Sequence, residues 1–182
     1  MIARKLRLAW LAPLALLALL AGCRATRTEA PKPAAPPKAK VASVYFADKG
    51  LTYMEAEARD TLASDDPTLQ ANAAVKELLL GPEEDGHARV IPRETTLLGL
   101  TVKDKVATVD LSAAFTEKFK GGSNVASMAV YTLVNTVCAV DGIEKVLITV
   151  AGKPVEEFGG ALSLAEPLAA DTKLIGGEKL GS

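Results

Sequence analysis

The 182-residue chain has few of the residues on which most enzyme chemistry depends. It contains one histidine, His87, so a metal site built from two histidines of one chain is excluded. His87 follows Asp85 in a polar loop, and we interpret it as a solvated turn residue rather than a catalytic base. No nucleophile is paired with a base in the sequence pattern. The sequence therefore predicts a protein that is not an enzyme, with no catalytic residue, metal or cofactor.

Aromatic residues are also scarce, at 4% of the chain. The only tryptophan, Trp10, lies in an N-terminal apolar segment that we expect to be cleaved. Sites that bind glycans depend strongly on aromatic side chains that stack on the sugar faces. The scarcity of aromatic residues therefore weakens, without excluding, a role in binding a cell-wall glycan or a small wall-derived ligand.

Only two cysteines are present, and the first follows a segment typical of an export signal. A basic head with Arg4, Lys5 and Arg7 precedes an apolar run from Leu8 to Leu20, which is shorter than the ~20 residues that a membrane-spanning helix needs. The ending Leu-Ala-Gly-Cys resembles a bacterial lipobox, which implies cleavage before Cys23 and a diacylglycerol on its thiol. The alternative is an ordinary signal peptide with an incidental cysteine. We predict a lipoprotein signal peptide over residues 1–22 and lipidation at Cys23.

The second cysteine, Cys138, then has no partner for a disulfide within the chain. It lies in an apolar helical run, where a buried structural role is the expected one.

Residues 23–40 are predicted to be a tether, because four prolines stand among alanine and lysine and no apolar period is visible. At ~3 Å per residue such a segment reaches roughly 50 Å. The tether is basic, whereas residues 41–182 contain 21 acidic and 13 basic residues. An anionic membrane surface attracts the tether and repels the rest of the chain. The acidic balance also excludes nucleic acid as a partner.

Two helices are predicted from apolar spacing and from their boundary residues. The first lies between Asp66, a helix cap followed by Pro67, and Gly81, which supplies the left-handed end before Pro82. The second runs from about residue 124 to residue 140, is apolar on most sides and should be the more buried. Gly121 to Asn124 precede this helix without the signature of a phosphate loop, and Asn124 is expected to cap it.

A β-hairpin is predicted over residues 98–111, around a two-residue turn at Asp104 and Lys105. The expected pairs Val102–Ala107, Leu100–Val109 and Leu98–Leu111 place apolar side chains on one face. Lys105 is a poor turn residue, because both central positions need a positive φ, so a longer loop is the alternative.

The remaining strands are predicted at residues 41–47, 51–58 and 145–151, with lesser candidates at 155–158 and 161–164. The fold class is therefore α/β (α+β): a mixed sheet with two amphipathic helices packed on it. The predicted domain covers residues 41–170, and residues 171–182 are predicted to be a frayed tail.

Acidic residues elsewhere have structural interpretations. Asp110 and Ser112 end a strand and are expected to cap the next turn. The run from Glu83 to Asp85 is contiguous, whereas a calcium loop spaces its oxygen ligands, so no metal site is predicted.

The sequence resembles the GerMN domain family over roughly residues 44–168. The resemblance rests on the motifs and segments Val44-Tyr45-Phe46, Glu77 to Pro82, Ile91-Pro92, Val109 to Ser112 with Phe115, the second helix, and Val146 to Gly152. Lys105 stands where the family usually has glycine, and one copy is present where sporulation members tend to have two in tandem.

The resemblance implies an α/β module on the outer, extracytoplasmic face of the bacterial cell membrane, often in lipoproteins, and kinship with the ring-building folds of sporulation assemblies. It implies protein–protein contacts in sporulation, germination or other envelope complexes, and it transfers no catalytic residue. We therefore expect a lipid-anchored interaction module whose partner is another envelope protein, with self-association as a further option. A binder of a wall glycan or small ligand is the alternative, and a hydrolase is the weakest hypothesis. Such contacts need an exposed edge or apolar patch, and we expect short edge strands, such as that at residues 155–158, to supply it by strand pairing.

Overall fold

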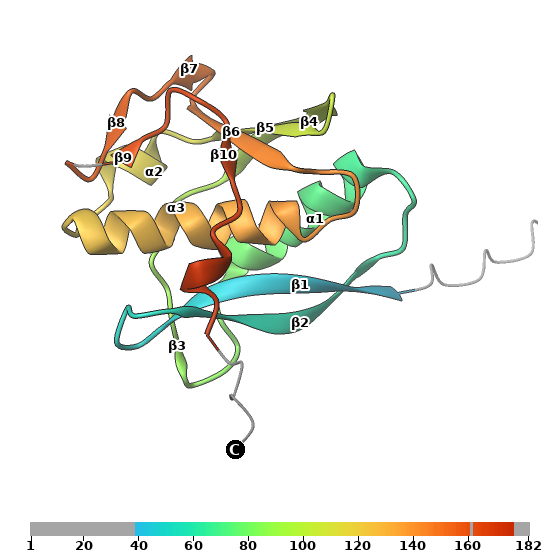
Figure 1. The fold of residues 1–182 in the computed structure, drawn as a ribbon, viewed down its shortest axis with the longest axis horizontal. Helices are drawn as coiled ribbons and strands as arrows, with labels where there is room; N and C mark the ends of the chain where they lie inside the picture. The colour runs from blue at the N-terminus through green and yellow to red at the C-terminus, as the bar shows by residue number, and fades with distance from the viewer. Residues whose placement is uncertain (1–38, 161, 177–182) are drawn as a thin grey trace, which may run out of the picture. The chain divides into compact units, whose positions relative to one another are not determined.

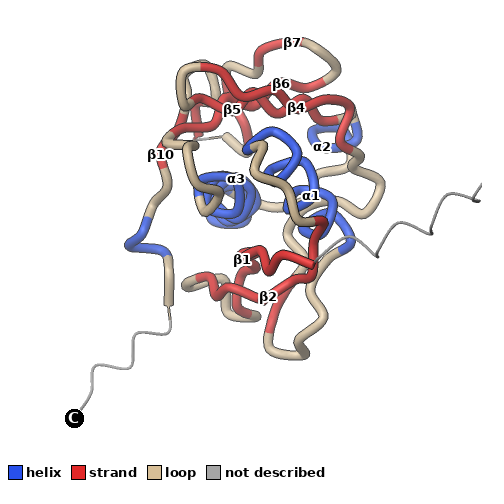
Figure 2. The backbone as a smooth tube through the Cα atoms, turned by 90° about the vertical axis from the view of Figure 1, so that its right-hand side faces the viewer, coloured by secondary structure: helices blue, strands red, loops and turns tan. Residues whose placement is uncertain are grey.

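The structure is a computed structural model, and it describes residues 39–160 and 162–176. Two sheets enclose a pair of helices, as Figures 1 and 2 show. The first sheet has the strand order β2-β1-β3 and the second β10-β6-β5-β4, with β7 (Lys153–Pro154) also paired to β6. A small third sheet pairs the two short strands Glu157–Phe158 and Leu162–Ser163. The helices α1 (Pro67–Leu80) and α3 (Ser123–Cys138) lie side by side between them. The predicted α+β class is confirmed.

The first sheet is built on a long hairpin of β1 (Ala39–Asp48) and β2 (Met54–Leu62), which pair from Ala39–Leu62 to Ala47–Met54. Asp48 organises the turn, because its carboxylate accepts the backbone N–H groups of Gly50, Thr52 and Tyr53 at 2.6–2.9 Å. The two-residue strand β3 (His87–Ala88) pairs with the end of β1.

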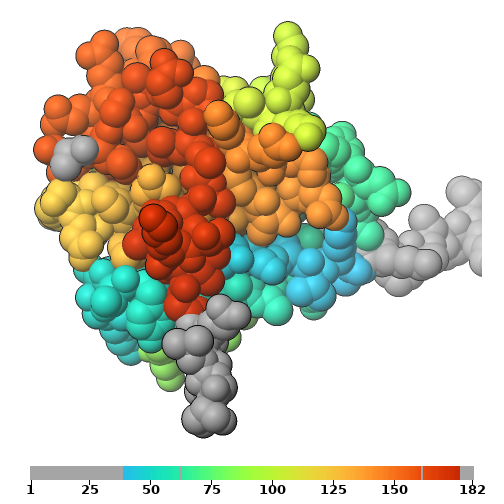
Figure 3. All heavy atoms as spheres, in the orientation of Figure 1, coloured from blue at the N-terminus to red at the C-terminus, as the bar shows by residue number. Residues whose placement is uncertain are grey.

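The second sheet contains the predicted hairpin, now β4 (Leu97–Lys103) and β5 (Val106–Leu111). Asp104 and Lys105 have φ values of 51° and 66°, so the two-residue turn with two positive φ angles is confirmed. The hairpin tip projects from the surface in yellow-green (Figure 3). The chain then passes through α2 (Ala114–Glu117) and α3 before β6 (Lys145–Val150) pairs parallel to β5.

One predicted hairpin pair is wrong. Leu111 lies opposite Leu97, and the register shifts between Leu97 and Gly99, so that Leu98 is an extra residue in the strand. Such a bulge turns its side chain away from the regular alternation, and Leu98 is 57% exposed.

The helix α1 begins and ends at the predicted boundary residues. Asp66 accepts the N–H of Thr68 at 2.8 Å, Pro67 opens α1, and Gly81 ends it at φ 96°. In α3 the prediction of an Asn124 cap is wrong: Gly122 is the cap residue, and Asn124 donates to the carbonyl of Leu51 at 3.0 Å. Ten residues of α3 are buried, and they lie on more than one side of the helix. A single sheet covers only one side, so α3 needs a sheet on each side. The prediction of one mixed sheet is corrected to two sheets, one on each side of α3.

The C-terminal part is less frayed than predicted. After β8 (Glu157–Phe158), β9 (Leu162–Ser163) and β10 (Leu168–Ala169), a 3-10 turn covers Thr172–Leu174. The side chain of Asn135 holds Asp171 by two hydrogen bonds, and Gly176 donates to Met54 at 2.8 Å. The tail prediction is therefore wrong for residues 171–176, which pack on the domain because Asn135 and Met54 supply their polar contacts. Within the described part of the chain, no helix combines the length and apolar character needed to cross a bilayer.

Candidate functional site

The main concentration of charge lies on the inner face of β2. Pairing with Val44 and Phe46 places Glu57 and Glu55 on the side of the sheet that faces the helices, and Arg59 follows on the same side. Glu57 is 2% exposed and Arg59 is 4% exposed. Buried charges are costly unless they are paired and hydrogen-bonded, so these contacts decide what the cluster does.

Glu57 is fully occupied as a hydrogen-bond acceptor. It accepts Arg59 Nε at 3.0 Å, the backbone N–H groups of Glu83 and Glu84 at 3.0 and 3.2 Å, and a nitrogen of His87 at 2.6 Å. Burial raises the pKa of this carboxyl, but these hydrogen bonds outweigh burial and lower the pKa to about 2. Glu57 is therefore an ionised anchor for the loop after α1.

His87 is 7% exposed, so its prediction as a solvated turn residue is wrong. Its Nδ1 lies 2.6 Å from Glu57 Oε1 and its Nε2 lies 3.1 Å from Glu55 Oε2. Burial lowers the pKa of the imidazole, but the two carboxylates outweigh burial and raise it above 6.5. Both nitrogens donate in the charged form, which leaves no lone pair for a substrate proton or a metal.

Arg59 joins three elements around this pair. Its guanidinium donates to Glu83 Oε1 at 3.0 Å and to the Gly81 carbonyl at 2.8 Å, and it lies 5.3 Å from the centre of the Phe46 ring. Among the described residues no serine, threonine or cysteine side chain is hydrogen-bonded to the cluster. The arrangement clamps the end of α1 and the following loop onto the first sheet, and it is structural.

The charge of His87 gives a pH dependence with a defined sign. Because the folded pKa is raised, its contribution to stability is present below pH 6.5 and is lost as pH rises through the folded pKa. We expect the free energy of unfolding of the wild type to fall above pH 6.5 relative to that of His87→Gln, by about 1.4 kcal/mol for each pKa unit. Urea unfolding from pH 6 to 9 measures this, and the one imidazole NMR titration reports the pKa directly. A midpoint below 6.5 would contradict it.

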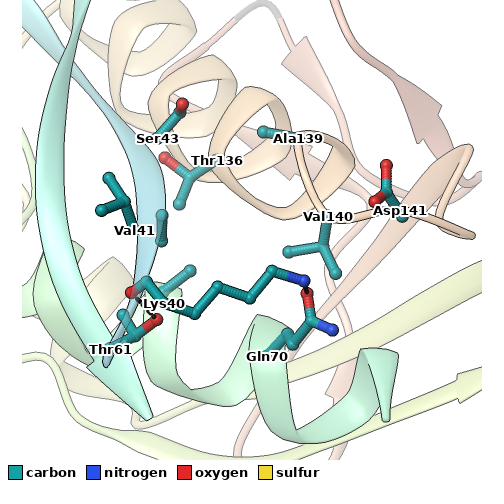
Figure 4. A pocket seen from close by; sticks show the side chains of 11 residues that line it. Lys40, Val41, Ser43, Thr61, Gln70, Thr136, Ala139, Val140 and Asp141 are labelled. Carbon is teal, nitrogen blue, oxygen red and sulfur yellow. Dashed lines mark hydrogen bonds between the residues drawn. The ribbon is translucent and has the colours of Figure 1, made fainter. Parts of the chain in front are cut away.

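A polar cleft of about 190 Å³ lies between the open edge of β1 and the C-terminal end of α3 (Figure 4). Lys40 extends along the cleft and donates to Gln70 Oε1 at 2.8 Å, and Asp141 stands on the opposite wall. At residues 41–43 β1 has no strand on this side, whereas Thr136 Oγ1 accepts the N–H of Tyr45 at 2.9 Å. None of the eleven lining residues is aromatic, so the cleft offers no stacking surface for a sugar.

A second surface is apolar. Leu69 and Leu80 on α1 are 59% and 70% exposed, and Leu98 at the start of β4 is 57% exposed. Single exposed apolar residues are common on protein surfaces. Exposed apolar residues that lie close together, in contrast, mark a contact surface.

The other predicted sites have structural roles. Asp110 accepts Thr149 Oγ1 at 2.9 Å and the N–H of Gly152 at 2.8 Å, so it holds β6 and does not cap a following turn. Ser112 Oγ accepts the N–H of Thr96 at 3.0 Å. Cys138 is half-buried with a free thiol, and burial raises its pKa. Within residues 39–160 and 162–176 no group of three acidic, histidine or cysteine side chains is placed to hold a metal. Cys23 and the predicted signal peptide lie outside the described residues.

The charged cluster was missed from the sequence, although a signal for it exists. Glu55, Glu57 and Arg59 alternate along one strand, and period-2 charges opposite the apolar positions of β1 mark an inward-facing charged strand. Such charges on an outer strand of a sheet discourage pairing with other chains.

Comparison with known proteins gives a family match over most of the described domain. The sequence profile of the Germane family, described as sporulation and spore germination, matches residues 43–156. No curated protein matches the chain.

Two solved structures share the fold. A candidate lipoprotein from Clostridium perfringens is 21% identical with a TM-score of 0.53, over 74% of this chain and 91% of that one. The tandem GerMN domains of the sporulation protein GerM from Bacillus subtilis are 21% identical with a TM-score of 0.57, over 72% of this chain. The match spans 46% of that tandem structure, so this chain covers about half of its length.

Proposed function

The chain belongs to the Germane family of sporulation and spore germination domains, and on that basis we propose that it is an interaction module of an envelope complex. The proposed protein is held on the extracytoplasmic side of the cell membrane by a lipid on Cys23. The basic tether of residues 24–38, which precedes β1, keeps the domain within roughly 45 Å of the membrane surface. Its role is to help assemble or maintain a sporulation, germination or other envelope complex by contacting another envelope protein.

The observation that carries this proposal is the exposed apolar surface at α1 and the start of β4. Leu69, Leu80 and Leu98 are each more than half exposed on α1 and β4, two elements that pack against each other, and in the described region only Val41 on β1 is a further large apolar side chain exposed to this degree. The charged cluster at Glu57 is saturated by internal contacts and offers no reactive group. A contact function therefore requires less of this structure than catalysis does. The structural likeness to a candidate lipoprotein supports a lipid-anchored placement.

A second candidate function rests on the cleft in Figure 4. Lys40 and Asp141 supply both signs of charge, and the free backbone groups of β1 supply donors and acceptors for a small polar ligand from the cell wall. If the chain purified from membranes retained cell-wall fragments and no protein partner, that result would favour this alternative. The cleft has a small volume of about 190 Å³, which restricts the ligand to one or two sugar or amino-acid units.

The anchor and the partner can be tested together by replacing Cys23→Ser in the full chain. We expect the wild type in the membrane fraction and, after crosslinking in cells, one recurrent envelope protein attached to it. The serine variant should leave the membrane fraction, because a signal peptide alone provides no permanent anchor.

Two controls define the outcome. Deleting residues 41–176 should abolish capture of the envelope protein, and shortening the tether should preserve it. A Cys23→Ser protein that stays tightly bound to membranes would exclude the lipid anchor, and capture that persists without the domain would exclude the interaction role.

A further inference from the structure

The outer side of α1 carries a stripe of side chains at helical spacing. Leu69, Ala73, Lys76 and Leu80 stand at positions i, i+4, i+7 and i+11, which fall on one side of a helix. Leu69, Lys76 and Leu80 are exposed and Ala73 is half-buried. We call these four residues the α1 stripe. The opposite side of α1 is buried in the core through Ala71, Ala74, Val75 and Leu78.

Two hollows flank the α1 stripe, one beside each half of the helix. The first has a volume of about 740 Å³ and lies between Leu69 and Ala73 of the stripe and Ala63 and Ser64 of the preceding loop. The second has a volume of about 410 Å³ and is bordered by Leu79, Leu80 and Leu97. Each end of the helix therefore presents an exposed leucine and a hollow next to it.

We propose that the α1 stripe is a self-association surface that pairs with the same stripe of a second copy of this chain, the two helices antiparallel about a two-fold axis. This arrangement sets Leu69 of each copy against Leu80 of the other, and Ala73 against Lys76. Leu80 of one copy then lies over the first hollow of its mate, and Leu69 lies over the second. The small side chain of Ala73 near the axis lets the two helices approach closely. In a two-fold interface every favourable contact occurs twice.

Charge complementarity selects the antiparallel arrangement. Lys76 of one copy, placed against Ala73 of the other, lies beside the first hollow, which Asp60 and Glu77 line, and Glu77 also lies 3.7 Å from Arg59 of its own copy. A parallel pair would instead set Lys76 against Lys76. The pattern is thus favourable in one orientation and unfavourable in the other, which limits association to a closed dimer.

The expected interface is small. A 14-residue helix is about 21 Å long, and its stripe with the two hollows gives a contact area at the lower end for specific complexes. Confinement of the lipid-anchored chain to the membrane raises its effective concentration, which favours such a weak contact. This step deepens the proposed function and rests on its membrane anchor, by naming one partner as a second copy.

The test is disulfide trapping of the full-length, membrane-anchored chain in a Cys138→Ser background. Two differently tagged copies are expressed together, one with Leu69→Cys and one with Leu80→Cys. After mild oxidation we expect a mixed disulfide dimer, because opposed positions on packed helices bring cysteine Cα atoms within bonding range. The yield should exceed several-fold that of a matched pair with Leu69→Cys and Val41→Cys. Val41 is 63% exposed and belongs to β1.

A second variant separates a lost contact from a lost fold. Ala73→Lys sets a lysine against Lys76 of the other copy at the axis of the pair, so it should abolish the Leu69–Leu80 crosslink while the thermal unfolding midpoint stays near that of the parent. Equal yields for the matched and control pairs, or a crosslink that survives Ala73→Lys, would overturn the proposal. If the crosslink is absent while an envelope protein is still captured, self-association fails and the interaction role stands. If both are absent, both fail.

Discussion

Replacing Glu57 by alanine is expected to lower the free energy of unfolding by about 3–5 kcal/mol, because it leaves charged neighbours buried without their partner. Arg59, which is 4% exposed, would lose the Glu57 carboxylate, and His87 would lose one of its two carboxylate partners. The backbone N–H groups of Glu83 and Glu84 would lose their hydrogen-bond acceptor. Since a typical domain is stable by only 5–15 kcal/mol, this is a large fraction of the total. Urea unfolding at pH 7 measures the change.

The matched control is Glu94→Ala, which removes the same charge from an exposed position. We expect its effect to stay within about 0.5 kcal/mol of zero. A double variant, Glu57→Leu with Arg59→Met, should recover part of the loss, because it removes the stranded charge as well as the pair. A Glu57→Ala protein as stable as Glu94→Ala would show that the cluster does not hold the loop.

The same carboxylate sets the acid sensitivity of the domain. Its pKa falls from 4.5 to about 2 on folding, so its contribution is present above pH 4.5 and is lost as pH falls through about 2. The difference corresponds to about 3 kcal/mol, which agrees with the loss expected on substitution. The stability gap between the wild type and Glu57→Ala should therefore narrow steadily from pH 4.5 downward.

The elements predicted well from the sequence are those whose boundaries are local. Asp66, Pro67 and Gly81 each act within one helical turn, so they define α1 without knowledge of the rest of the fold. The β4–β5 hairpin is similarly local, because its turn and its alternation of side chains fix the pairs from Lys103–Val106 to Gly99–Asp110. The bulge at Leu98 was missed because either leucine, 97 or 98, satisfies an apolar position opposite Leu111.

The parts that were missed depend on distant residues. His87 is 30 positions from Glu57, and its loop reads as solvated until β2 is known to turn its charges inward. The division into two sheets likewise follows from α3, which is apolar on most sides and needs cover from both. Asn135 holds Asp171 across 36 positions, so the end of the domain could not be placed from composition.

Leu100→Asp is expected to be the most damaging single change in the hairpin. Leu100 is 8% exposed and belongs to the main core with Val109 and Leu111, on the side of β4 that faces α1. A carboxylate there would be buried without a partner, so we expect a loss of more than about 4 kcal/mol and a largely unfolded protein at 37 °C. Thermal unfolding followed by circular dichroism measures this.

Thr101→Asp is the control that separates burial from strand propensity. It introduces the same residue one position later in the same strand, where the side chain is exposed on the other face. Both variants lower the preference for a strand equally, so only Leu100→Asp should abolish the cooperative transition. Equal melting curves for the two would mean that the inward face of β4 contributes no more to the core than its outward face. That result would contradict the packing of the second sheet on the helices, on which the position of the α1 stripe beside β4 depends.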